Sequence, residues 1–201
     1  MKGCVSASPL STAAPLLLRI RRVNPRLLCR SLLRSLGQAL LGASSLNEAV
    51  EALLGACREL LGAREGYLLL AEESAPLPAF FPTLAGERLA QCSRHGGQSA
   101  LLSLLRERGK PFWENDFARS NLAALLPPDH PQLQNLLVVP LPGPEGPLGA
   151  IVLANKPGGF SEADAQLVAA LGSLAAPTLV REQALAGAQR AWRALQASST
   201  A

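Results

Sequence analysis

Two short apolar runs joined by a turn are the feature of this chain that most limits its fold. The first run spans Leu136 to Leu141 and the second spans Leu148 to Ala154, and neither contains a charged residue. The residues between them include three prolines and two glycines. Uncharged runs of this length, separated by turn-forming residues, predict two buried strands joined as a hairpin. We therefore expect this hairpin to lie at the centre of a sheet.

The residues after the second run predict a long helix. Gly158 and Gly159 break the chain, and Ser161 and Asp164 then have the spacing of a capping box. In that motif each side chain bonds the backbone N–H of the other residue. Apolar residues continue at helical spacing beyond them. We expect a helix over residues 162–195, bent or briefly interrupted at Pro177 because proline removes a backbone hydrogen bond.

The composition predicts one globular domain with extensions. The chain has 201 residues, of which 48% are hydrophobic and 17% are charged, and it has room for a domain of about 130 to 150 residues. Residues 1–47 carry seven basic residues and no acidic one, whereas the remainder carries twelve basic and fifteen acidic residues. The net charge of +4 therefore comes from the N-terminal part, and we expect no nucleic-acid binding by the domain.

The four cysteines and the N-terminal residues bear on location. The cysteines lie far apart without metal-ligand spacing, which fits a reducing, cytoplasmic environment. Residues 1–25 are expected to be a disordered tail, or an extension read from a start codon placed too far upstream; an organelle transit peptide is the alternative. Their apolar run is too short to cross a membrane, and no transmembrane segment is expected.

Residues 26–44 are expected to form an amphipathic helix. Leucines fall on one broad face, and Arg26, Arg30 and Arg34 fall on another. We expect the leucine face to pack against a partner helix, for example in a dimer. The alternative is that this basic helix lies on an anionic membrane.

The middle of the chain has further recognisable elements. A capping box at Ser45 and Glu48 begins a helix that ends at Gly62. The remaining expected elements are a buried strand at 66–71, an irregular strand at 79–81, a helix at 98–108, an aromatic strand within 110–117 and a short helix at 121–126.

The hairpin and the residues around it resemble the GAF domain, a small-molecule-sensing module of bacterial signalling proteins. The residues that carry the resemblance are Val139-Pro140-Leu141, Leu148-Gly149-Ala150-Ile151, Leu153-Ala154-Asn155-Lys156, Gly159-Phe160, Asp164, and Gly109-Lys110-Pro111 with Asp116. The resemblance implies an α+β fold related to the PAS and profilin folds. It implies a central antiparallel sheet of five to six strands, with helices on one face, a pocket on the other, and flanking N- and C-terminal helices. We expect the GAF domain at 45–180, followed by a C-terminal helix and tail at 181–201.

The resemblance also implies which residues line the pocket and which are structural. The pocket candidates are Arg94, His95, Phe112, Trp113, Asn115, Asp116, Phe117 and His130. For the aromatic residues the alternative is core packing, and Asn115 with Asp116 could instead cap a helix. The structural residues of the family motif are Pro140, Gly149, Asn155, Lys156, Phe160 and Asp164. We expect Lys156 and Asp164 to form a pair that ties the strand end to the helix start.

The sequence also bears on several more specific functions that some GAF domains have. The stretch from Pro127 to Pro140 is similar to one that holds haem in some sensor kinases, which would make His130 the iron ligand; a structural histidine is the alternative. Cyclic-nucleotide binding is not favoured because Ala165 replaces the family's glutamate. Reduction of methionine sulfoxide is not favoured because it needs closely grouped cysteines, and only Cys92 lies near the relevant loop. Attachment of a tetrapyrrole to Cys92, as in phytochromes, is not favoured because the flanking family motif is absent.

The sequence contains no catalytic motif of the GxSxG, HExxH or Walker A type. Enzymatic activity is left open, with an enzyme of the sulfoxide-reductase type as a further alternative, and no metal other than haem iron is expected. The expected function is a stand-alone GAF sensor or regulator in bacterial signal transduction, with an unidentified small-molecule ligand or a kinase or regulator as its partner. The first alternative is a GAF-shaped dimerisation module without a ligand, and the second is a haem-based redox or gas sensor through His130. A parallel homodimer through residues 26–43 and 162–195 is expected.

Overall fold

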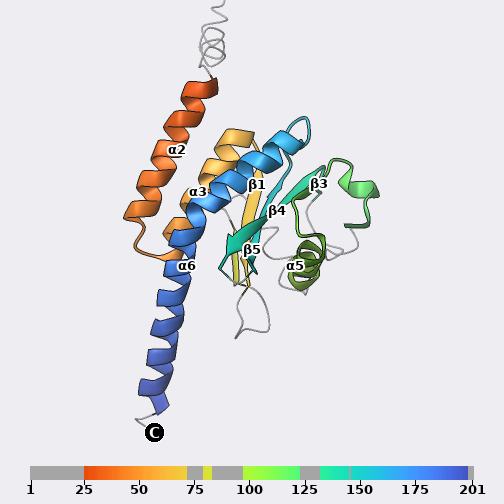
Figure 1. Ribbon diagram of the computed structural model, residues 1–201. Coiled ribbons are helices and arrows are strands. Elements are labelled where there is room, and N and C mark those ends of the chain that lie inside the picture. Colours follow the sequence, from red (N-terminus) through yellow and green to blue (C-terminus); the bar gives the residue numbers. More distant parts are fainter. Residues whose placement is uncertain (1–24, 72–78, 83–96, 123–131, 145, 199–201) are drawn as a thin grey trace, which may run out of the picture.

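The computed structural model describes residues 25–71, 79–82, 97–122, 132–144 and 146–198. These residues form an α+β domain in which helices cover an antiparallel sheet, and a long C-terminal helix extends beyond it (Figure 1). This confirms the predicted fold class. The predicted N-terminal tail, Arg94, His95 and His130 lie outside the described residues.

Within the described residues, the sheet has five strands in the order β2-β1-β5-β4-β3, with neighbours antiparallel. The strands are β1 (Glu65–Leu70), β2 (Ala79–Pro82), β3 (Phe112–Glu114), β4 (Leu136–Gly143) and β5 (Gly146–Ala154). Strands β4 and β5 form the predicted hairpin, with Leu137 opposite Leu153 and Val139 opposite Ile151. The hairpin occupies the middle of the sheet, as its uncharged sequence indicated.

Three helices lie on one face of the sheet. They are α2 (Pro25–Gly42), α3 (Leu46–Leu61) and α6 (Glu162–Ser198). Together they bury the side chains of alternate strand residues: Leu68, Leu70, Leu137, Val139, Leu141, Ile151 and Leu153. The alternation follows from the two-residue period of a strand. In Figure 1, α3 and α6 lie against the sheet and α2 lies outside them.

Part of the leucine stripe predicted for residues 26–44 packs within the chain, whereas Leu33 and Leu41 are exposed. Leu36 and Leu40 of α2 are buried in the same core as α3 and α6, whereas Arg30 and Arg34 are exposed. The partner helices of this stripe therefore include helices of the same domain.

The opposite face of the sheet is also covered by a helix. Leu101, Leu102 and Leu105 of α5 (Gly97–Arg108) pack there with the other set of strand residues. That set is Tyr67, Leu69, Leu136, Val138, Ala150, Val152 and Ala154. The prediction that helices lie on one face only is therefore wrong. Since β4 and β5 are apolar on both faces, water must be excluded from both.

The helix ends follow the predicted capping residues with one difference. At the start of α6, the Ser161 N–H donates to Asp164 Oδ2 over 2.8 Å and the Asp164 N–H donates to Ser161 Oγ over 3.3 Å. At the start of α3, the Glu48 N–H donates to Ser45 Oγ, but the Glu48 carboxylate accepts from the N–H and hydroxyl of Ser44 instead of Ser45. Gly62 ends α3 with φ of 68°, as predicted.

Helix α6 runs as one helix through Pro177, and its axis changes direction between the part that crosses the sheet and the part that leaves the domain (Figure 1). Among the described residues, α6 alone is long and apolar enough to cross a membrane by length and composition. Val168, Leu171, Ala175 and Leu179 pack on the sheet, so the apolar composition of this part is that of a core helix.

The backbone of β1 leaves no room for a side chain at Gly149, which gives a test of the fold. A Cβ added there would lie 1.8 Å from the carbonyl oxygen of Leu69, so we expect Gly149→Ala to lower the free energy of unfolding by about 3 kcal/mol or more. The matched control is Gly55→Ala in α3, where an added Cβ meets nothing within 4 Å; it should be neutral or stabilise by up to ~1 kcal/mol. Urea denaturation measures both, and a Gly149→Ala protein as stable as the wild type would contradict the register of β1 and β5.

Candidate functional site

The segment from β5 to α6 is anchored by the side chain of Asn135. This residue precedes β4 and is 5% exposed. Its Nδ2 donates to the Lys156 carbonyl over 2.9 Å, and its Oδ1 accepts from the Lys156 N–H over 2.8 Å. A buried amide that both donates and accepts satisfies its own polar atoms and those of the backbone it holds. Asn135 thus continues the pairing of β4 with β5 beyond the last strand residue.

Asn115 makes a second pair of hydrogen bonds of the same kind. It follows β3, and its Oδ1 accepts from the Phe160 N–H over 2.7 Å while its Nδ2 donates to the Phe160 carbonyl over 2.9 Å. Phe160 itself is buried in the core beneath α6. The neighbouring Gly159 has φ of 82°, and a Cβ there would lie 2.6 Å from Asn115 Oδ1, which explains why a glycine precedes Phe160.

Asn155 connects this segment to two other strands. Its backbone is left-handed, with φ of 56°, a conformation that asparagine tolerates better than most residues. Its Oδ1 accepts from the Gln134 N–H over 2.9 Å, and its Nδ2 donates to Glu65 Oε2 over 2.5 Å. Burial raises the pKa of Glu65, and the bond from Asn155 and the nearby Arg64 and Arg58 oppose that rise.

Lys156 and Asp164 form the predicted pair. Lys156 Nζ lies 2.5 Å from Asp164 Oδ2 and 5.8 Å from the centroid of the Phe160 ring. Partial burial of Asp164 opposes ionisation, but the bonds from Lys156 and Ser161 outweigh it, and the net effect lowers the pKa of Asp164. The pair ties the end of β5 to the first turn of α6, where a negative charge is favoured by the helix dipole.

The polar groups of the family motif are therefore occupied in holding the backbone. Pro140 and Gly149 lie in the central hairpin, and the side chains of Asn155, Lys156 and Asp164 bond to groups of the same chain. Sequence reasoning missed Asn135; a polar residue directly before an uncharged strand was the signal that could have identified it.

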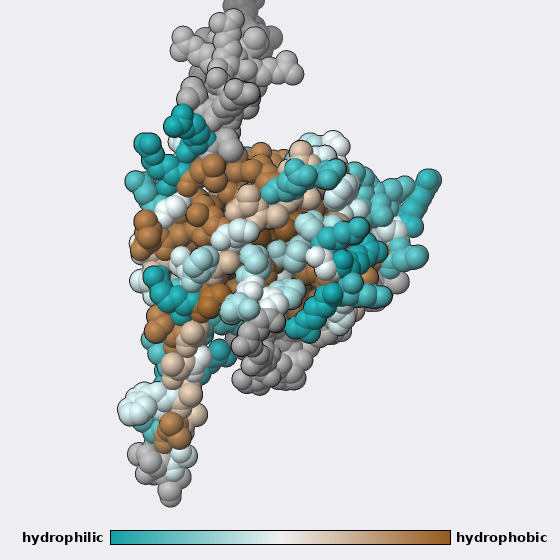
Figure 2. Space-filling view, in the orientation of Figure 1, coloured by the Kyte–Doolittle hydropathy of each residue, from teal (hydrophilic) through white to brown (hydrophobic). Residues whose placement is uncertain are grey.

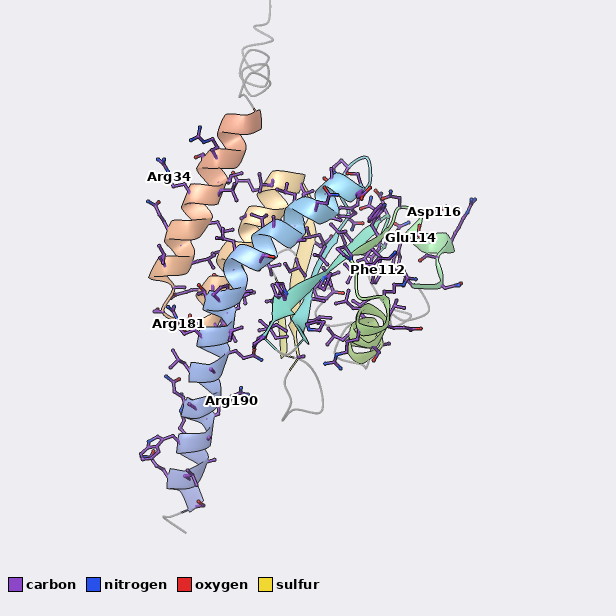
Figure 3. The ribbon with its side chains drawn as sticks, in the orientation of Figure 1. Arg34, Phe112, Glu114, Asp116, Arg181 and Arg190 are labelled. Carbon is purple, nitrogen blue, oxygen red and sulfur yellow. The ribbon has the colours of Figure 1, made fainter. Side chains whose placement is uncertain are left out.

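The predicted pocket residues separate into two groups (Figure 3). Phe112 and Phe117 are buried with α5, and the Arg108 guanidinium lies 4.6 Å from the Phe112 ring centroid. Trp113 and Asp116 are exposed, and Asp116 lies 3.5 Å from Arg119. The structure therefore brings only the two phenylalanines to the α5-covered face. A ligand role for any of these residues stays a prediction.

The α5-covered face also contains Tyr67, which was not among the predicted site residues. It is the only tyrosine of the chain, it is 2% exposed, and it lies among the aliphatic side chains of that face. A buried tyrosine combines a large apolar ring with a hydroxyl that can bond to a polar group. Its signal in the sequence was a hydroxyl within an otherwise aliphatic strand.

Cys57 is buried in the core on the other face of the sheet, which α3 and α6 cover. Burial raises the pKa of the Cys57 thiol to about 12, so it stays protonated at neutral pH and is a poor nucleophile. Among the described residues no group of three or more His, Cys, Asp or Glu side chains is placed to hold a metal ion.

Comparisons with known proteins agree with this architecture. The sequence model of the GAF domain family matches residues 43–180. The GAF domain of a phosphoenolpyruvate-protein phosphotransferase from Acinetobacter superposes with a TM-score of 0.64 at 19% identity, covering 81% of this chain and 96% of that one. The equivalent domain from Coxiella burnetii gives 0.64 at 18% identity, covering 82% and 99%. The GAF domain of a putative sensor histidine kinase from Pseudomonas syringae gives 0.54 at 22% identity, covering 86% and 98%. A search of curated proteins gave no match.

The Lys156–Asp164 pair predicts a pH-dependent contribution to stability. We expect Asp164→Asn to lower the free energy of unfolding at pH 7 by about 1–2 kcal/mol, because a charge-assisted bond and half of the capping box are weakened. Since the folded pKa of Asp164 is lowered, this contribution is fully present above the unfolded pKa of about 4. It is lost as the pH falls through the folded value.

Thermal unfolding from pH 2 to 7 measures this difference between the wild type and Asp164→Asn. The control is Glu162→Gln in the same turn, whose side chain is exposed and which should change stability little. A difference that grew as the pH fell would contradict the pair.

Proposed function

Because the chain belongs to the GAF domain family, we propose that it is a regulatory domain that binds a small molecule on the α5-covered face of its sheet. Binding would shift the strands of the sheet and, through them, the position of α6. The signalling proteins from which similar GAF domains come include a putative sensor histidine kinase. The partner of this chain would then be a signalling protein, a second copy of the chain, or both.

One observation carries this proposal: the central strands contribute to both cores. In β4, Val138 faces α5 and the next residue, Val139, faces α3 and α6. In β5, Val152 faces α5 and the preceding residue, Ile151, faces α3 and α6. A molecule that displaced α5 or repacked its face would move the strands on which α6 rests, because close-packed cores transmit small shifts. Coupling of this kind between two sites is typically worth about 1–3 kcal/mol.

The side chains of the face suggest the class of ligand. Most are aliphatic or aromatic, and Tyr67 supplies a hydroxyl. Such a surface favours a small, largely apolar molecule. The proposal does not require a metal or a reactive side chain.

Native mass spectrometry of the full chain purified from its own host tests this proposal. We expect a retained small molecule, and we expect Tyr67→Phe to reduce its occupancy about tenfold because a polar group of that face is removed. The control is Trp113→Phe, which changes an aromatic residue outside that core and should leave occupancy unchanged. Failure of any molecule to co-purify, or equal retention by Tyr67→Phe, would contradict the proposed site. A Soret band in the preparation would identify the ligand as haem, the group implied by the resemblance around His130.

We also propose that the chain acts as a parallel homodimer. Dimerisation is also the function expected under the alternative, a GAF-shaped interaction module that binds no ligand. Helix α6 has an apolar stripe turned away from its own core: Leu174, Leu185, Trp192 and Leu195 are 47, 51, 62 and 64% exposed. Their spacing follows the seven-residue repeat of a coiled coil, in which Leu174 and Leu195 share one heptad position and Leu185 and Trp192 share the other.

Two further observations favour a second copy as the partner of this stripe. Glu182 is the last buried residue of α6, so none of residues 183–198 is buried in the core of the domain. Helices of about 12–15 residues are marginal without tertiary packing. Beyond Arg181 and Glu182, the residues that would flank the seam, Ala184, Gln189, Ala191 and Gln196, are uncharged, so this part of an identical helix can approach without like-charge contacts. Figure 2 shows hydrophobic residues along the α2 and α6 side, with a further patch on the protruding part of α6.

The stripe predicts that one substitution abolishes the dimer. We expect Trp192→Asp to weaken self-association at least about 100-fold, because it places a charge in the apolar seam. The matched control is Ala194→Asp, which adds the same charge two residues away on another side of the helix and should leave the dimer intact. Sedimentation velocity over a concentration series measures both, and a wild type that stays monomeric at high micromolar concentration would rule out the dimer.

A further inference from the structure

The exposed side of α2 carries both arginine and leucine side chains. Arg30 and Arg34 are exposed, and Leu33 and Leu41 are 37 and 85% exposed. Leu33 and Arg34 follow Arg30 by three and four positions. Leu41 follows Arg34 by a further seven positions, so the four side chains share one face of the helix. We call it the Arg30–Leu41 face.

The described part of the chain leaves this face open to solvent. Figure 1 shows α2 outside α3 and α6, and Figure 3 shows Arg34 on the side of α2 away from the sheet. Neither Arg30 nor Arg34 forms an ion pair with another residue that the structure describes. The face thus presents leucine side chains to water beside two charges that the domain does not compensate.

The distribution of charge indicates the class of partner. Residues 1–47 contain seven basic residues and no acidic one, whereas the remainder has twelve basic and fifteen acidic residues. A partner that complements the Arg30–Leu41 face is therefore anionic, and it also has to accept leucine side chains. An anionic lipid surface does both, because lipid phosphates receive the guanidinium groups and the edge of the acyl layer receives the leucines. A nucleic acid would leave the leucines in water.

We propose that the Arg30–Leu41 face is a docking surface for an anionic lipid membrane. Helix α2 lies in the plane of the lipid surface, with both guanidinium groups among the phosphates and Leu41 at the edge of the acyl chains. Two arginines and two leucines support weak, reversible binding that is sensitive to salt. The face shares no residue with the apolar stripe of α6, so this inference rests on neither the proposed ligand nor the proposed dimer.

Flotation of the full-length chain with lipid vesicles tests the proposal. The vesicles consist of phosphatidylcholine alone, or of phosphatidylcholine with about one-third phosphatidylserine. We expect the wild type to bind the anionic vesicles and not the neutral ones, and to be released by added salt. The double variant Arg30→Gln, Arg34→Gln should bind about 25-fold more weakly, from roughly fivefold for each arginine. Leu41→Gln should weaken binding about tenfold, because its apolar contact is lost.

Two controls separate docking by α2 from the general attraction of a basic protein and from a loss of folding. The double variant Arg106→Gln, Lys110→Gln removes the same net charge from exposed side chains at and just after the end of α5. It should bind within about twofold of the wild type. Gln38→Leu adds a leucine to an exposed position three residues before Leu41, and it should strengthen binding severalfold. All the substituted side chains are exposed, so thermal unfolding without vesicles should be unchanged.

The remaining outcomes overturn the proposal in distinguishable ways. A wild type that does not bind the anionic vesicles removes it, and so does binding that survives both the double arginine variant and Leu41→Gln. If Leu41→Gln weakens self-association but not vesicle binding, a second copy of the chain covers this face instead. If duplex DNA binds with the same dependence on the two arginines and Leu41→Gln has no effect on vesicle binding, the partner is a polyanion and not a membrane.

Discussion

The fold depends on the burial of both faces of β5. This strand lies between β1 and β4, and its residues Ala150 to Ala154 are buried alternately under α5 and under α3 and α6. A strand in that position can contain no charged side chain, since neither face reaches water. It must also accept two neighbouring backbones at strand spacing, and at Gly149 the backbone of β1 leaves no room for a side chain. The other elements are arranged around this strand.

The elements set by local chemistry could be predicted from the sequence. The hairpin followed from two uncharged runs and a turn, and the ends of α3 and α6 followed from Ser45, Gly62, Ser161 and Asp164, because caps and left-handed glycines act within a few residues. The face covered by α5 was predicted wrongly. Leu101, Leu102 and Leu105 show that α5 is buried on one side, but they do not say against which face of the sheet. That choice depends on chain connectivity.

The polar anchors show the same limit. Lys156 and Asp164 lie eight residues apart, and their pairing could be inferred from the motif. Asn115 bonds to a residue 45 positions away and Asn155 to one 90 positions away, and no local pattern predicts such partners. Together with Asn135, these anchors hold the segment between β5 and α6 to β1 and to the residues next to β3 and β4, and Lys156 joins that segment to the first turn of α6. At the other end of the crossing, Gln183 Nε2 donates to the Ala71 carbonyl over 3.0 Å. Helix α6 is thus bonded to the sheet at both ends of its buried part before it leaves the domain.

The central claim is that α6 serves two cores, one within its domain and one shared with a second copy. Hydrogen–deuterium exchange of the full chain over a range of protein concentrations tests this claim most directly. We expect amides at 165–179 to be protected at every concentration, because the domain buries them. We expect amides at 184–198 to become protected only as the dimer forms. If residues 184–198 exchanged at the same rate at every protein concentration, whether fast or slow, the claim would be contradicted.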